Sequence, residues 1–135
     1  MRRMKLLIII TLFSLKAFCP SDPAIRIVKT EAIRPFKPLI FAIGSVECSF
    51  DTLAYNPLEQ ATGYFQIRPI RIEDYNKRTG SNYTLNDMFD YYKAEKVFLY
   101  YASRIGPYDM ERIIRNWNGK WSLTDDYYKK VKSKL

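Results

Sequence analysis

The sequence predicts a mainly helical domain. Apolar residues recur at helical spacing in several stretches, and residues that favour helix starts or helix ends flank those stretches. The chain has 135 residues, which is enough for one domain. We therefore expect a single domain of about five to six helices joined by loops.

The first predicted helix carries a glutamate on its apolar face. It begins at Pro38, since proline fits the first position of a helix, and its apolar stripe consists of Leu39, Ile40, Ala42, Ile43 and Val46. Glu47 lies four residues after Ile43 and seven after Ile40, so helical geometry places it in that stripe. Burial disfavours a charged carboxylate, and we therefore expect a raised pKa for Glu47.

The next elements are a loop and a short polar helix. Residues 51–62 contain Asn56-Pro57 and no long periodicity, which is typical of a loop. A polar helix is expected over Arg71–Arg78, because Gly80 follows it and glycine commonly ends helices.

A long helix is predicted in the second half of the chain. Residues 84–87 (Thr-Leu-Asn-Asp) resemble a capping box, and the helix is expected to follow them as far as Ile105. Gly106-Pro107 would end it. Its buried stripe would consist of Val97, Phe98, Tyr101 and Ile105.

Two short helices complete the prediction. Asp109 can cap a helix that runs through Trp117, after which Asn118-Gly119 forms a turn. Thr124 or Asp125 can cap the last helix, which carries Tyr127, Tyr128 and Val131.

The N-terminus is typical of a secretory signal peptide. In residues 1–19 a basic start precedes the apolar run Leu6–Leu15, which is too short to span a bilayer. A buried hydrophobic helix or strand is one alternative, and a lipidated Cys19 in a lipoprotein is another. We expect residues 20–35 to form a leader segment and residues 36–135 the folded domain of an exported, periplasmic or extracellular protein.

Composition excludes several kinds of chemistry. The chain has no histidine, which rules out Ser-His-Asp and Cys-His catalysis and histidine-based metal sites. Removing residues 1–19 removes four of the 22 basic residues and no acidic one, leaving a net charge of about +4. Much of the basicity therefore belongs to the export signal, and we expect no nucleic-acid partner. Cys48 would be the one cysteine of a chain cut after Cys19.

Three segments carry the candidate chemistry. Glu47 is followed sixteen residues later by residues 63–67 (Gly-Tyr-Phe-Gln-Ile), and residues 117–119 (Trp-Asn-Gly) come much later. This arrangement resembles the lysozyme-like soluble lytic transglycosylase (SLT) family. In that family a Glu-Ser helix end precedes a Gly-Leu-Met-Gln-Ile-like segment and then a Tyr-Asn-Ala/Gly-like segment. The resemblance covers most of residues 36–131.

The resemblance implies a lysozyme-like fold and cleavage of the MurNAc–GlcNAc bond of peptidoglycan. Glu47 would be the single catalytic residue, giving its proton to the leaving oxygen and then acting as base. The C6 hydroxyl of muramic acid would attack C1 and form a 1,6-anhydro end. The alternative role for Glu47 is structural, as a helix-end carboxylate paired with Arg68 or Arg71.

The first two motif segments also nominate substrate-binding residues. Gly63 allows a close backbone approach or a positive φ. Gln66 offers a carbonyl and an amide for N-acetyl and hydroxyl groups, and Tyr64 offers an apolar face for a sugar ring. The alternative is an ordinary buried turn with aromatic packing. Cys48 replaces the family's serine and is a weaker hydrogen-bonding group.

Trp117 and Asn118 are predicted to lie beside the acid. Trp117 occupies the position of the family's tyrosine and can stack on a sugar, but it lacks a phenol. A tryptophan of the hydrophobic core is the alternative.

The sequence leaves two other functions open. One is a lysozyme-type hydrolase (muramidase) on the same fold, which would need a second carboxylate. The candidates for that carboxylate are Asp51, Glu59, Glu73 and Asp74. The other is a non-catalytic module for binding or assembly at the cell wall. In each case we expect peptidoglycan glycan strands as the partner, no cofactor or metal, a monomer, and membrane contact only through the export signal or a lipid anchor.

Overall fold

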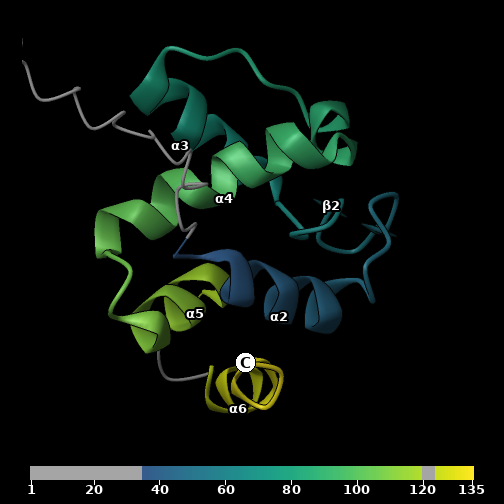
Figure 1. The fold of residues 1–135 in the computed structure, drawn as a ribbon. Helices are drawn as coiled ribbons and strands as arrows, with labels where there is room; N and C mark the ends of the chain where they lie inside the picture. Colours follow the sequence, from purple (N-terminus) through teal and green to yellow (C-terminus); the bar gives the residue numbers. More distant parts are fainter. Residues whose placement is uncertain (1–34, 120–123) are drawn as a thin grey trace, which may run out of the picture. The chain divides into compact units, whose positions relative to one another are not determined.

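A computed structural model of the chain describes residues 35–119 and 124–135. The predicted signal peptide, and the predicted leader apart from Pro35, lie outside these residues. The described part contains five α-helices, one 3-10 helix and one two-stranded hairpin, which confirms the mainly helical prediction (Figure 1). These are α2 (Lys37–Glu47), β1 (Tyr55–Asn56), β2 (Ala61–Thr62), α3 (Pro69–Thr79), η2 (Asn86–Phe89), α4 (Tyr91–Ile105), α5 (Met110–Asn118) and α6 (Asp125–Lys132).

Helix α2 forms as the sequence predicts. Pro38 lies in its first turn, where a missing amide proton costs no intrahelical hydrogen bond. The buried side of α2 includes Leu39, Ile40, Ala42 and Ile43. Glu47 is the last residue of the helix, and Ser49 and Phe50 follow it with positive φ angles of 51° and 68°. The chain therefore turns sharply just beyond Glu47.

Part of the predicted loop is a short hairpin. β1 and β2 pair in antiparallel register, with Tyr55 opposite Thr62 and Asn56 opposite Ala61. Thr62 and Ile67 then exchange backbone hydrogen bonds of 3.0 and 2.9 Å, which closes the turn between them. The loop prediction missed these strands because two-residue strands carry no periodic signal.

The long helix begins later than predicted. Thr84 and Asp87 do pair, since the amide and the hydroxyl of Thr84 both donate to the Asp87 carboxylate, but the pair lies at the start of the 3-10 helix η2. Asp90 caps α4 instead, since its carboxylate accepts from the amides of Tyr92 and Lys93. α4 then ends at Ile105, and α3 ends before Gly80 in the left-handed conformation, as the sequence predicts.

The last two helices pack against each other and against α2. Asp109 caps α5 through the amide of Arg112, as predicted. α6 lies across α2 and α5 (Figure 1), and Val131 is its buried residue. Thr124 stands at the N-cap of α6 without a side-chain capping bond. This packing places the C-terminal helix beside the helix that carries Glu47.

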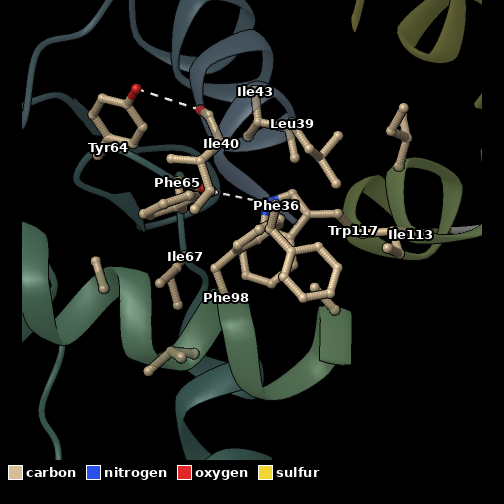
Figure 2. Close-up of a cluster of buried hydrophobic side chains, with 14 of the residues drawn as sticks. Phe36, Leu39, Ile40, Ile43, Tyr64, Phe65, Ile67, Phe98, Ile113 and Trp117 are labelled. Carbon is tan, nitrogen blue, oxygen red and sulfur yellow. Dashed lines mark hydrogen bonds between the residues drawn. The ribbon is translucent and has the colours of Figure 1, made fainter. Parts of the chain in front are cut away.

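The core is built around Phe65. Its ring stacks on Phe98 with a centroid distance of 4.9 Å and meets the edge of Trp117 at 6.3 Å. Figure 2 shows Leu39, Ile40 and Ile43 of α2 converging on this cluster. In the part of the chain that is described, no helix is long and apolar enough to cross a bilayer.

Candidate functional site

Glu47 is a half-buried carboxylate at the C-terminal end of α2. The phenol of Tyr127 in α6 donates a hydrogen bond of 2.7 Å to Glu47 Oε1. The two residues are 80 positions apart in sequence and meet because α6 packs on α2. The bond fixes one oxygen of the carboxyl group, and no hydrogen bond from another described residue reaches the other oxygen.

Burial raises the pKa of Glu47 above its ordinary value of 4.5. The Tyr127 hydrogen bond and the charge of Arg68 favour the ionised form and oppose this rise, while the charge of Glu59 adds to it. Burial has the largest effect, so the carboxyl retains its proton at a higher pH than an exposed glutamate. The predicted direction of the shift is confirmed.

Arg68 links several parts of the site. Its Nη2 donates 3.0 Å to the carbonyl of Asn118, and its Nη1 lies 3.8 Å from Glu59 Oε1. Among the described residues its ion-pair partner is therefore Glu59, and Arg68 acts on Glu47 only from a distance. The alternative that Glu47 is held by a direct ion pair to Arg68 or Arg71 finds no such contact within residues 35–119 and 124–135.

The turn after β2 requires glycine at position 63. Gly63 has a φ of +75°, and a Cβ built on it would lie 2.0 Å from the carbonyl oxygen of Met88. Gln66 also has a positive φ, of 48°, and its amide donates to the carbonyls of Gly63 (2.9 Å) and Ala54 (3.3 Å). Gln66 is half-buried and holds the turn in shape. Within the described residues it makes no direct contact with Glu47.

Tyr64 is a core residue, which favours the alternative of a buried turn with aromatic packing. Its side chain is 8% exposed and packs against Phe65 and Tyr91. Its hydroxyl donates to the carbonyl of Ile40 (Figure 2). Gly44 makes room for the ring, since a Cβ there would lie 2.0 Å from Tyr64 Cζ. Tyr64 therefore locks the motif turn onto α2 rather than offering a face to a ligand.

Cys48 strengthens the same junction. Its thiol donates to the carbonyl of Tyr64 at 3.3 Å and to that of Gly44 at 3.4 Å. Burial raises the pKa of this thiol, so it stays protonated and can donate. Cys48 thus takes a positioning role next to Glu47 despite its weaker hydrogen bonds.

Trp117 is also a core residue, as the alternative interpretation held. It is 5% exposed, and its indole nitrogen donates 3.1 Å to the carbonyl of Phe65 (Figure 2). The guanidinium of Arg71 lies 4.4 Å from the centre of its ring. One edge of the indole is thus bonded within the core and the Arg71 guanidinium lies over its ring, which favours the role of a core tryptophan.

Asn118 is placed near the site through its backbone. Arg71 donates to the carbonyls of Asn116 and Trp117, and Arg68 donates to that of Asn118. Two cations therefore satisfy the last carbonyls of α5, where cations are favoured. Asn118 itself is half-exposed. Its side chain remains a predicted substrate contact.

The other carboxylates separate into two groups. Asp74 is engaged by Arg78 and by the hydroxyl of Tyr101, and Asp51 accepts from the amide of Leu53. Glu59 alone among the predicted candidates acts electrostatically on Glu47. No group of three or more acidic or cysteine side chains in the described residues could hold a metal ion.

A separate hollow lies along the N-terminal part of α2. It has a volume of about 680 Å³ and is lined by residues of α2, α3 and α4, including Phe36, Ile40, Tyr75, Leu99 and Tyr100. None of the predicted site residues is among the residues that line it.

The sequence interpretation missed Tyr127 as a member of the site. A signal was present: Tyr127 and Val131 are four residues apart and share a helix face. Since Val131 is fully buried, that face must turn inward. What the pattern could not give was the partner, because nothing local links α6 to the end of α2.

Comparisons with known proteins return no relative. No protein-family model, no curated protein and no solved structure matches this chain.

Proposed function

We propose that this chain is an exported enzyme of lysozyme-like fold that cleaves peptidoglycan glycan strands as a lytic transglycosylase, with Glu47 as its acid and base. The observation that carries the proposal is the half-buried Glu47 carboxyl, whose pKa is raised by burial and whose orientation is fixed by Tyr127. A carboxyl group in such surroundings suits general acid catalysis near neutral pH. The substrate comes from the motif resemblance.

In the proposed reaction the Glu47 carboxyl group acts twice, first as acid and then as base. Protonated Glu47 gives its proton to the glycosidic oxygen as the bond from C1 to that oxygen breaks. The resulting carboxylate then takes the proton of the muramic acid C6 hydroxyl, and the oxygen of that hydroxyl bonds to C1. Glu47 ends protonated, and the product carries a 1,6-anhydro ring.

Tyr127 supports the charged half of this cycle. Its hydrogen bond is stronger when Glu47 is ionised, since hydrogen bonds to charged groups exceed neutral ones. The phenol does not lose its own proton, because burial and the neighbouring carboxylate raise the pKa of Tyr127. Burial and the phenol therefore favour opposite protonation states of Glu47, which suits a group that must both give and take a proton.

Hydrolysis is a second candidate, and Glu59 favours it. A muramidase needs a second carboxylate to activate water or to form a covalent intermediate. The charge of Glu59 reaches Glu47, and its side chain is 56% exposed, which leaves it open to water. Arg68 Nη1 lies 3.8 Å from Glu59 Oε1, so one arginine lies beside the second carboxylate and also acts through its charge on Glu47.

Mass spectrometry of digested sacculi tests the proposal. Purified sacculi are incubated with the full chain or its secreted form, and the soluble fragments are analysed. We expect fragments with 1,6-anhydro ends. Reducing ends would assign the hydrolase instead, and sacculi that bind the chain but stay intact would assign the non-catalytic module.

A further inference from the structure

The position of α6 decides the surroundings of Glu47. This helix supplies Tyr127, the one described side chain that bonds to the carboxyl group. α6 is only eight residues long, and Val131 is its one fully buried side chain. A helix this short is not stable alone, so contacts with α2 and α5 must hold it.

Arg115 of α5 provides several of those contacts. Its side chain is 11% exposed, and its Nη1 donates 2.6 Å to Asp125 Oδ1 and 3.2 Å to Thr124 Oγ1. Its guanidinium also lies 4.8 Å from the ring centre of Tyr128. Glu111 accepts from its Nε at 2.8 Å and orients the group. One buried cation thus contacts the start of α6 and the residue next to Tyr127.

We propose that Arg115 is a positioning residue of the Glu47 site: it holds α6 so that Tyr127 covers and bonds the carboxyl group. This inference rests on the proposed function only for its effect on cleavage. The link from Arg115 to Glu47 stands on contacts alone. Charge-assisted bonds such as those of Arg115 are directional, so they fix the rotation of α6 as well as its distance from α5.

The position of α6 should change the pKa of Glu47 in a defined direction. The groups that act on its carboxyl are Tyr127 of α6, Arg68 at the start of α3 and Glu59 in the turn after β1. Burial is the largest cause of the raised pKa, and α6 contributes to that burial because it packs across α2. Displacing α6 admits water to the carboxyl group, so the pKa of Glu47 should fall towards its ordinary value. Removing only the phenol keeps the burial, so the pKa should rise.

The test is a titration of the Glu47 carboxyl carbon by nuclear magnetic resonance in the full chain. We expect the midpoint to fall in Arg115→Met and to rise in Tyr127→Phe. The double variant should titrate like Arg115→Met alone, since a displaced α6 no longer brings residue 127 to the carboxyl group. Arg112→Met is the matched control on the same helix: Arg112 is exposed and its side chain has no described contact with α6. It should leave the midpoint unchanged.

Two further variants keep the proposal falsifiable if Arg115→Met fails to fold. Arg115→Lys keeps the charge, so its Glu47 midpoint should lie closer to the wild-type value than that of Arg115→Met. Asp125→Asn removes the ion pair from its exposed side and should lower the midpoint by a smaller amount. Cleavage of sacculi should drop about tenfold in Arg115→Met, because small misplacements of catalytic groups cost that much or more.

The outcomes separate the two proposals. A folded Arg115→Met or Asp125→Asn variant whose Glu47 midpoint stays unchanged or rises would overturn the positioning role, even if the wild type cleaves sacculi. A lowered midpoint in a chain that never cleaves sacculi would support the positioning role and reject the proposed function.

Discussion

The two regions that meet at Glu47 are built in different ways. The turn at Gly63–Ile67 is closed by backbone hydrogen bonds between residues close in sequence, and it packs its aromatic rings into the core. The Glu47–Tyr127 contact joins residues 80 positions apart across two helices. The sequence motif lies in the first region, whereas the group that orients the carboxyl lies in the second. The motif therefore supplies mostly a scaffold, and the surroundings of Glu47 depend on a helix outside it.

The largest effect on stability is expected at Gly63, in the scaffold. Gly63→Ala combines a positive φ with a Cβ only 2.0 Å from the Met88 carbonyl oxygen. We expect a loss of about 3 kcal/mol or more in the free energy of unfolding, since backbone strain and overpacking add. Urea denaturation measures it.

Gly80→Ala is the matched control for that variant. Gly80 has a similar φ of +71°, but nothing lies within 4 Å of a Cβ there. Only the strain of the left-handed backbone applies, about 1 kcal/mol. Equal losses at the two glycines would contradict the claim that the motif glycine is required by close packing.

A smaller loss in the free energy of unfolding is expected for a substitution at Trp117. Trp117→Phe removes the indole donor from the buried carbonyl of Phe65 and shrinks a packed ring, which costs about 2 kcal/mol. Cleavage per folded molecule should remain near the wild-type value, because Trp117 supports the core. If activity falls far more than the folded fraction does, Trp117 contacts the substrate and does not belong to the scaffold alone.

The smallest effect concerns the pH dependence of stability. Because the pKa of Glu47 is raised in the folded state, its contribution to stability is fully present below about pH 4.5 and is lost as pH rises through the folded value. Glu47→Gln removes this loss while keeping an oxygen that can accept from Tyr127. The melting temperature of Glu47→Gln, measured relative to that of the wild type, should therefore rise between pH 4 and pH 7. A difference that is constant with pH would mean that the carboxyl is not held neutral.

Much of the fold follows from local patterns. α2, α3 and α5 lie close to their predicted positions because proline, glycine and aspartate mark their ends. The start of α4 differs from the prediction because the paired Thr84 and Asp87 lie at the start of a 3-10 helix, and Asp90 caps α4 instead. Such competition between nearby caps depends on packing rather than on sequence spacing.

The site was predictable only in part. Glu47 could be singled out because a carboxylate in an apolar stripe contradicts the usual burial preference. Tyr64 and Trp117 both lie in the core, and sequence does not show whether an aromatic residue in a motif faces a ligand or the core. Tyr127 could not be paired with Glu47 because long-range contacts leave no local signal.

The measurement that tests the central claim most directly compares the release of soluble fragments from sacculi by wild type, Glu47→Gln and Glu59→Gln, with melting temperatures recorded alongside. We expect Glu47→Gln to stay folded and to lose about 10²–10⁴-fold in rate or more, because one carboxyl serves as both acid and base. Glu59→Gln should cleave at close to the wild-type rate. A folded Glu47→Gln variant that releases fragments at near the wild-type rate would contradict the account.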